Sequence, residues 1–293
     1  MWPYVIAATK YNPISGGGRT LWNLADALAK AGQGSFVPDS AGEAPPGMSI
    51  KRVNDAKLTR MMRTGAIAVY PDVMPGNVWH SKHPVHWALV YPGAVKNEIG
   101  TCWTPGTVEG EKVYVFHKML LKYFPRGMED LPELFMVSVE CDLFNCDELP
   151  AKRGGFWYKN KWRDGTPPWV STLPHMPLPM KRPDFATYFK RHVYGVFLDY
   201  LTFAMHEAGL CGTWAVLPRN SVFDREDYER SPLHHGLPGV AWDAQPAEIE
   251  RARAEVKPRS DGSNAVSDRY EEVQAVTRVE VEAFIVDTQG GWR

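Results

Sequence analysis

MWPYVIAATKYNPISGGGRTLWNLADALAKAG, residues 1–32, opens the chain with three structural signals in succession. Residues 4–8 form a short apolar run typical of a buried strand. A glycine-rich turn follows at residues 15–18, and residues 20–31 have the apolar spacing of an amphipathic helix that ends at Gly32. A strand, a glycine turn and a helix in this order predict an α/β domain with a largely parallel sheet.

The same alternation continues along the chain and indicates a second α/β half. Further strands are predicted at residues 35–38, 66–70, 113–116, 134–139, 154–158, 196–198 and 214–218. Helices are predicted at residues 202–211 and 246–256, a helix or loop at 183–194, and a long closing helix at 269–286. We place the domain boundary in the polar segment 142–152, which gives domains 1–148 and 149–293.

Charge and cysteine content exclude several classes of protein. The chain has 33 Lys and Arg against 34 Asp and Glu, so binding to nucleic acid or anionic membranes cannot depend on overall charge, although a local basic patch can. No apolar stretch approaches the ~20 residues of a membrane span, and no secretion signal is visible. The four Cys form no C-x-x-C pair, which predicts reduced thiols in a cytoplasmic protein.

The first candidate for chemistry is the glycine run Gly16, Gly17 and Gly18 at the mouth of the first helix. Glycines let a ligand approach the backbone, and free N–H groups at a helix start favour an anion such as phosphate. The run has neither the G-x-G-x-x-G spacing of a dinucleotide site nor the GK[ST] ending of a P-loop, which disfavours NAD binding and ATP hydrolysis. A plain flexible turn explains the same residues equally well.

Two further candidates lie in the second half. Arg153, Lys159 and Lys161 flank an aromatic strand, where cations could neutralise a leaving diphosphate; a solvated basic loop is the alternative. Thr202 and Glu207 lie near the start of a helix that follows a strand, where they could hydrogen-bond a ribose or a phosphate. A helix whose glutamate faces solvent is the alternative there.

These segments, taken with several short motifs, resemble nucleotide-sugar-dependent glycosyltransferases of the two-domain GT-B type, in particular a bacterial and phage group. The motifs that carry the resemblance are Tyr70-Pro71-Asp72, Gly76-Asn77, Val85-His86-Trp87, Pro92-Gly93, Asp199-Tyr200-x-Thr202, Glu207-Ala208, Leu210-Cys211-Gly212 and Gly239-Val240-Ala241-Trp242. In the motif Asp199-Tyr200-x-Thr202, the order of Asp and Tyr is shifted relative to the family pattern. The resemblance spans most of the chain.

The resemblance implies a GT-B fold, with two Rossmann-like domains that face each other across a cleft and a C-terminal helix that closes the chain. The N-terminal domain would hold the acceptor and the C-terminal domain a nucleoside diphosphate sugar, with UDP favoured as the commonest donor nucleotide. If Thr202 and Glu207 play the roles of the matching residues in the family, they would hold ribose and phosphate. Arg153, Lys159 and Lys161 would stabilise the diphosphate charge, so no metal and no cofactor beyond the donor is required.

Other polar residues have competing explanations. His80-x-x-His83-x-x-His86 suggests zinc, but Pro84 interrupts a regular helix and no fourth ligand is fixed by spacing, so we interpret these as loop histidines. Asp72, at a strand end, is the candidate general base if the enzyme inverts, and a hydrogen-bonding role in the turn fits it equally well. Glu98 and Glu140 are the other carboxylates worth testing.

The predicted function is transfer of a sugar to a hydroxyl acceptor in the cytoplasm of a bacterium or a phage-infected host. The acceptor is either a glycan or a hydroxymethylated base in phage DNA, which would have to be flipped out while basic residues in 152–163 hold the phosphates. The alternatives are a non-catalytic protein that binds nucleotide or carbohydrate, and a nucleotide-sugar epimerase of the same fold.

Overall fold

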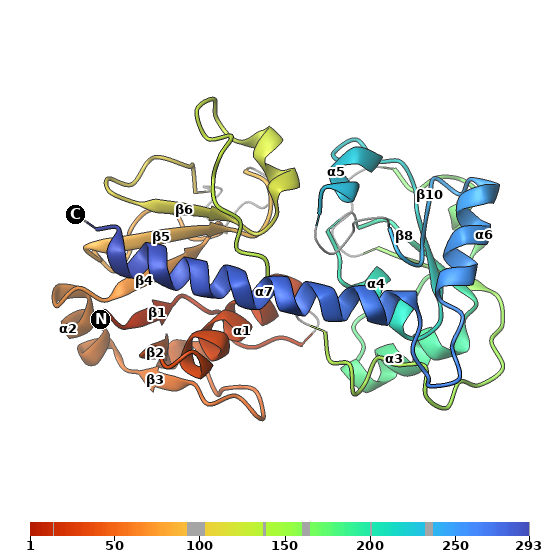
Figure 1. Ribbon diagram of the computed structural model, residues 1–293, viewed down its shortest axis with the longest axis horizontal. Coiled ribbons are helices and arrows are strands. Elements are labelled where there is room, and N and C mark those ends of the chain that lie inside the picture. Colours follow the sequence, from red (N-terminus) through yellow and green to blue (C-terminus); the bar gives the residue numbers. More distant parts are fainter. Residues whose placement is uncertain are drawn as a thin grey trace. The chain divides into compact units, whose positions relative to one another are not determined.

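A computed structural model describes residues 1–13, 15–92, 103–136, 139–159, 165–199, 201–231 and 237–292 of the chain. The chain divides into two compact units. The first consists of Met1–Ser138 together with Ala275–Arg293, and the second of Val139–Gln274. Each unit contains one parallel sheet with helices, in agreement with the predicted α/β class (Figure 1). The final helix, α7 (Ala265–Gly290), begins in the second unit and ends in the first.

The sheet of the first unit has six parallel strands in the order β3-β2-β1-β4-β5-β6, the order of a doubly wound Rossmann sheet. The strands are β1 (Tyr4–Ile6), β2 (Ser35–Pro38), β3 (Lys51–Val53), β4 (Ile67–Pro71), β5 (His83–Ala88) and β6 (Lys112–Val115). The predictions at 4–8, 35–38, 66–70 and 113–116 are confirmed. The prediction at 134–139 is wrong over residues 134–136, which form no named strand; residues 137–138 lie outside the described part.

Two helices cover opposite faces of this sheet. α1 (Gly16–Lys30) contributes Leu21, Trp22, Leu24 and Leu28 to one core, and α2 (Asp55–Arg63) contributes Leu58, Met61 and Met62 to the other. Successive residues of β1 alternate between them, because side chains of a strand point to opposite faces in turn. Short 3-10 turns occur at η1 (Asp39–Ala41) and η2 (Lys118–Tyr123).

Helix α1 starts four residues earlier than predicted. Gly16, Gly17 and Gly18 form its first turn rather than a separate turn before it. Glycine is a poor helix former, which is why the sequence pattern placed the start later. The N-cap residue Ser15 compensates: its hydroxyl accepts a hydrogen bond from the Gly18 N–H at 3.2 Å.

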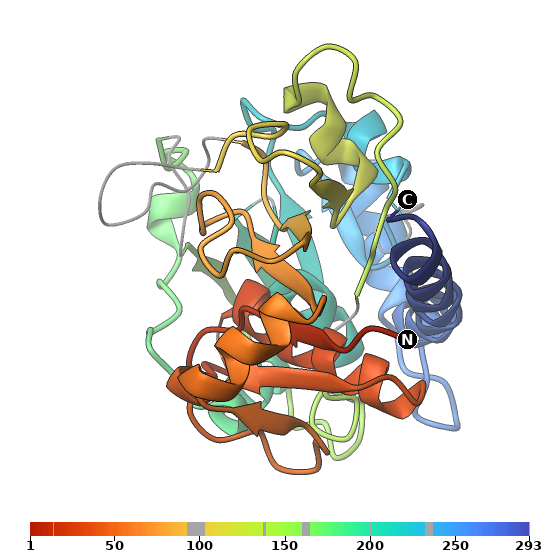
Figure 2. The same cartoon turned by 90° about the vertical axis from the view of Figure 1, so that its left-hand side faces the viewer.

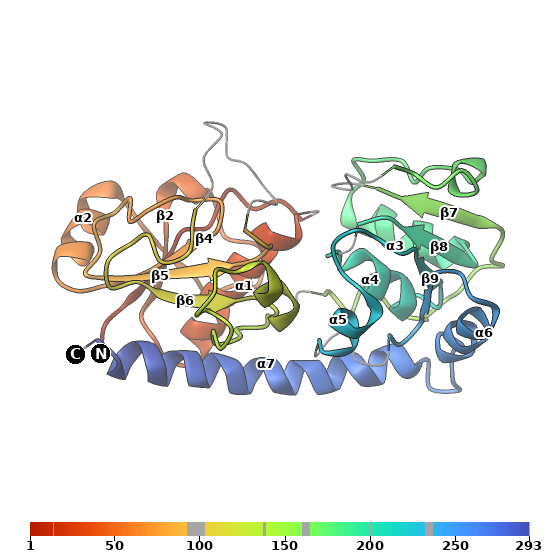
Figure 3. The same cartoon turned by 90° about the horizontal axis from the view of Figure 1, so that it is seen from above.

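The last part of α7 packs against the first sheet, which explains why residues 275–293 belong to the first unit although the sequence analysis grouped them with the second domain. Tyr114 donates a hydrogen bond to Asp287, and Lys112 forms an ion pair with the same carboxylate at 2.6 Å. The Tyr4 hydroxyl lies 2.6 Å from the Thr288 hydroxyl. As a result the two chain ends lie close together beside this sheet (Figures 2 and 3).

The sheet of the second unit has four parallel strands in the order β10-β9-β8-β7. They are β7 (Gly155–Tyr158), β8 (Tyr194–Phe197), β9 (Trp214–Leu217) and β10 (Val240–Trp242). His175 forms a parallel bridge to Trp157 on the side of β7 that faces away from β8. The chain thus passes from β7 to one side of that strand and then returns to form β8 on its other side, so the strand order reverses between β7 and β8. The helices are α3 (Arg182–Arg191), α4 (Ala204–Leu210), α5 (Arg225–Glu229) and α6 (Pro246–Glu255), with a 3-10 turn η3 (Val170–Thr172).

The predicted strands at 154–158, 196–198 and 214–218 and the predicted helices at 202–211 and 246–256 are confirmed. The segment left as helix or loop at 183–194 forms α3. Among the residues that the structure describes, no helix has the length and apolar character needed to cross a membrane.

Candidate functional site

Open parallel sheets bind ligands beyond the carboxyl ends of their strands, at the point where the strand order reverses. In the first unit this point lies between β1 and β4, and in the second between β7 and β8. The predicted residues Gly16–Gly18 and Asp72 follow β1 and β4, and Lys159 and Thr202 follow β7 and β8. Most of the predicted site residues therefore lie at these two edges.

The structure brings together three segments at the first edge. A Cβ atom placed on Gly17 would lie 3.4 Å from Leu89 Cδ1, and the Leu89 N–H donates to Asp72 Oδ1 at 3.2 Å. Residues 17, 72 and 89 are thus neighbours although they are far apart in the sequence. A Cβ atom at position 17 would make an ordinary van der Waals contact with Leu89, so the approach of α1 to the end of β5 does not itself require glycine.

Asp72 is half-buried directly after β4. Its hydrogen bond from Leu89 ties the end of β4 to the segment that follows β5, which is the structural role considered for it above. Asp72 as a general base stays a prediction.

The interpretation as loop histidines is wrong for two of the three, because His83 and His86 lie on β5, while His80 is in a loop. His83 Nδ1 lies 2.9 Å from the Gly65 carbonyl oxygen, and His86 is fully buried with Nδ1 2.6 Å from Glu111. The His86 ring stacks on Trp103 with 4.8 Å between ring centroids. Among the described residues, no three His, Cys, Asp or Glu side chains are grouped so that they could share a metal ion.

At the second edge the structure separates the predicted cations. Lys159 comes directly after β7, at its carboxyl end, whereas Arg153 precedes β7 and is exposed at the amino end. The four strand residues between them span about 13 Å, because a strand rises about 3.3 Å per residue. Arg153 and Lys159 therefore lie at opposite ends of β7, and a role for either in donor binding stays a prediction. Lys161 lies outside the described residues.

Thr202 and Glu207 flank the start of α4, and both already have partners. The Thr202 hydroxyl accepts a hydrogen bond from the Ala204 N–H at 3.2 Å, which stabilises the beginning of the helix. Glu207 is 1% exposed, and its carboxylate accepts hydrogen bonds from both terminal nitrogens of Arg182, at 2.9 and 2.7 Å. Both carboxylate oxygens of Glu207 are thus used inside the unit.

Arg182, which sequence reasoning missed, is the centre of this network. Its Nε donates to Glu140 at 2.7 Å, and its guanidinium lies 4.3 Å from the centre of the Phe144 ring. Burial acts to lower the pKa of Arg182, but the two carboxylates raise it overall. The network joins the first turn of α3 to α4 and to the segment before β7. Glu140 was a candidate catalytic carboxylate, and Glu98 lies outside the described residues.

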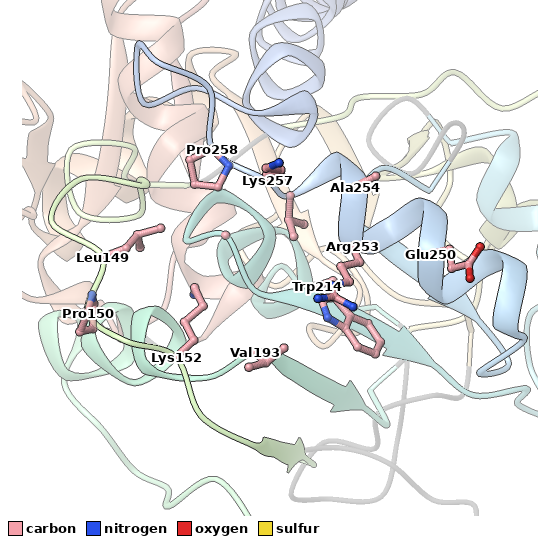
Figure 4. A pocket seen from close by; sticks show the side chains of 12 residues that line it. Leu149, Pro150, Lys152, Val193, Trp214, Glu250, Arg253, Ala254, Lys257 and Pro258 are labelled. Carbon is pink, nitrogen blue, oxygen red and sulfur yellow. The ribbon is translucent and has the colours of Figure 1, made fainter.

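The second unit also has a cavity of about 690 Å³ (Figure 4). Its walls include Lys152, Val193 and Trp214, which stand at the amino ends of β7, β8 and β9. This is the opposite edge of the sheet from Lys159 and Thr202, and no sequence motif indicated it.

Comparison with known proteins adds evidence on the fold. No protein-family model matches the chain, and no curated protein sequence matches it. Among solved structures, a sucrose-phosphate synthase from Thermosynechococcus elongatus matches with a TM-score of 0.53 at 12% identity, over 97% of this chain and 97% of that chain. The glycotransferase of kitacinnamycin matches with a TM-score of 0.48 at 12% identity, over 98% and 99%. The likeness to the sucrose-phosphate synthase structure confirms the GT-B fold that the resemblance implied.

Proposed function

We propose that the protein is a glycosyltransferase that moves a sugar from a nucleoside diphosphate sugar, with UDP favoured, to a hydroxyl acceptor. The observation that carries this proposal is the likeness to a sucrose-phosphate synthase fold over 97% of both chains. The positions of Asp72, Lys159 and Thr202 at the carboxyl edges of the two sheets support it, since that is where parallel α/β sheets bind ligands.

In this proposal the second unit binds the donor. Lys159 and Lys161 would neutralise the charge that develops on the diphosphate as the glycosidic bond breaks, so no metal is needed for that step. Thr202 would contact ribose or phosphate at the start of α4. Because Arg182 occupies both oxygens of Glu207, we assign to Glu207 a positioning role: it fixes Arg182 and thereby the start of α4.

The first unit would bind the acceptor, with Asp72 as general base for the acceptor hydroxyl. Five exposed cations on this unit would suit the phosphates of hydroxymethylated DNA, although Lys51, Arg52, Arg60 and Arg63 lie toward the amino edge of the sheet, opposite Asp72; the fifth is Lys57, in the first turn of α2. Among the described residues, only Arg52 of this group has an ion-pair partner, Asp39 at 4.0 Å. The segment proposed earlier for this task is less suitable, because the ammonium of Lys152 is bound by backbone carbonyls.

The donor test is a thermal-shift and donor-hydrolysis screen against UDP-, GDP-, ADP- and CMP-sugars. A donor at about 100 times its dissociation constant stabilises the folded state by about 2.7 kcal/mol, which corresponds to a rise of several degrees in Tm. Lys159→Ala should weaken donor binding at least about tenfold, since it removes a charge-assisted contact. Arg153→Ala is the matched control: it removes a cation from the other end of the same strand and should leave binding unchanged.

Each outcome of this screen is informative. Stabilisation without turnover in the presence of any acceptor would favour a binding protein, and conversion of the donor sugar without an acceptor would favour an epimerase. If no nucleotide sugar stabilises the protein, or if Arg153→Ala loses binding while Lys159→Ala keeps it, the proposed donor site is wrong.

The acceptor test is the salt dependence of binding to a duplex that contains hydroxymethylated bases, measured by fluorescence anisotropy. Replacing Lys57, Arg60 and Arg63 by Ala should reduce the slope of log K against log salt concentration by about 2.7, since each phosphate contact contributes about 0.9. The control replaces Lys30, Lys82 and Lys118 by Ala, which changes net charge equally on other exposed parts of this unit. Absence of DNA binding would leave a glycan as the acceptor.

A further inference from the structure

The cavity of the second unit is lined by two kinds of side chain. Its apolar walls come from the loop before β7, from the starts of β8 and β9, and from the end of α6. These walls are formed by Leu149, Pro150, Val193, Trp214, Ala254, Val256 and Pro258. Its polar side chains are Lys152, Glu250, Arg253 and Lys257 (Figure 4). An apolar cavity with a few charged groups is the usual composition of a small-molecule site.

The charged groups at the cavity differ in whether they already have hydrogen-bond or ion-pair partners. The Lys152 ammonium donates to the carbonyl oxygens of Phe189, His192 and Cys211 and to the Thr213 hydroxyl, at 2.8 to 3.4 Å. Lys152 therefore already uses its ammonium to bind the C-terminal ends of α3 and α4.

Arg253, Lys257 and Glu250 are exposed, and within the described part of the chain none of them has an ion-pair partner. α6 thus presents one unpaired cation, Arg253, and one unpaired carboxylate, Glu250, to the cavity, and Lys257 adds a second cation just after the helix ends. The excess of positive charge, added to that of Lys152, favours a ligand that carries a negative group.

Trp214 supplies an aromatic wall held in a fixed position. Its ring stacks on Tyr194 with 4.9 Å between centroids, and the side chain is 9% exposed. Its indole N–H is buried and has no hydrogen-bond acceptor among the described residues. Because this N–H is buried, the indole ring offers the cavity an apolar surface and no hydrogen-bond donor.

We propose that this cavity is a second ligand site, for a small anion with a flat apolar body such as an aryl phosphate or an aryl carboxylate. The apolar body lies against Trp214, Val193 and Val256, and the anionic group lies beside Arg253 and Lys257. Because the cavity is at the amino edge of the sheet, it is separate from the carboxyl edge assigned above to the donor.

The test is isothermal titration of the full-length protein with 1-naphthyl phosphate, and separately with 1-naphthol and with inorganic phosphate. We expect the dissociation constant of 1-naphthyl phosphate to lie between about 10 µM and 1 mM. 1-Naphthol alone and inorganic phosphate alone should each bind at least about tenfold more weakly. Comparable binding of 1-naphthol would overturn the anionic part of the proposal. Comparable binding of phosphate would overturn the apolar part.

Two variants assign the binding to the cavity. Ala254→Trp, at an exposed position of α6, fills the cavity and should abolish binding while the circular dichroism spectrum stays unchanged. Arg253→Ala with Lys257→Ala should weaken binding at least about tenfold. The control, Lys30→Ala with Lys82→Ala, removes the same charge from exposed positions of the first unit and should bind like the wild type. Binding that survives both cavity variants, or no binding by the wild type at millimolar probe, contradicts the proposal.

Discussion

Each unit is stabilised internally by partly buried charged groups, and the sign of the central groups differs between the two units. In the first unit the central groups are acids on α7: Asp287 accepts from Tyr114 and Lys112, and Glu280 accepts from the Phe135 N–H. In the second unit they are cations: Arg182 donates to Glu207 and Glu140, and Lys152 donates to the ends of α3 and α4. The difference predicts that the two units respond to mutation and to pH in different ways.

The largest effect is expected from Glu207→Ala in the second unit. This change leaves the Arg182 guanidinium, which is 6% exposed, with only Glu140 as a partner. Removing one member of a buried ion pair typically costs about 3–5 kcal/mol. Chemical denaturation would measure the loss, with Glu229→Ala as a control in an exposed pair that should cost less than about 0.5 kcal/mol.

This expectation also limits how Glu207 can be used to test donor binding. If Glu207→Ala unfolds the second unit, loss of donor binding in that variant says nothing about ribose contacts. If instead the variant is as stable as the wild type and binds no donor, Glu207 contacts the ligand directly and its positioning role is wrong.

A smaller loss is expected from Lys152→Met, which removes hydrogen bonds to the last carbonyls of α3 and α4 and keeps most of the aliphatic stem. The cost should be about 2 kcal/mol, because charged donors contribute about 1.5–3 kcal/mol and burial offsets part of it. Burial lowers the pKa of Lys152 to about 8. Between pH 8 and 10.5 the unfolded chain therefore binds more protons than the folded one. For this reason Lys152 makes the free energy of unfolding of the wild type increase with pH over that window. The variant should lack this rise.

The first unit should respond to pH in the opposite direction. Burial raises the pKa of Glu280 to about 7, against an ordinary value of 4.5. Between these values the folded state binds more protons than the unfolded state, so stability decreases as the pH rises from about 4.5 to about 7. Glu280→Gln should flatten this decrease, by on the order of 1 kcal/mol because the side chain keeps part of its exposure. Denaturation at pH 5 and pH 7.5 measures it, and an unchanged pH dependence would contradict the assignment.

The sequence predicted the fold well where the physical signal is local. β4 is recognisable because it is continuously apolar, as buried parallel strands are, and α1 because its apolar residues recur at the period of a helix. β5 was missed because it contains Pro84, which lacks an N–H and is unusual within a central strand. β3 was missed because it is a short edge strand with two exposed cations.

The candidate site was less predictable, because its contacts join distant parts of the chain. Arg182 is 25 residues from Glu207, and no spacing rule connects them. Arg153 and Lys159 looked like one basic group in the sequence, yet a strand of four residues places them at opposite edges of the sheet. Residues that are close in sequence can therefore lie at opposite edges of a sheet when a strand runs between them.

The smallest change in stability is expected from Asp72→Asn, and this makes it the clearest test of what the first unit contributes. The amide oxygen of asparagine can still accept the hydrogen bond from the Leu89 N–H, so the link between β4 and the end of β5 is kept and denaturation should shift by less than about 1 kcal/mol. An amide cannot take up a proton, however, so a general base would be lost and the transfer rate should fall about 10²–10⁴-fold. Asp72→Ala is the complementary variant, since it removes both the base and the hydrogen bond. If Asp72→Asn transfers sugar at the wild-type rate while Asp72→Ala is destabilised, Asp72 is a turn residue and the base must be sought elsewhere.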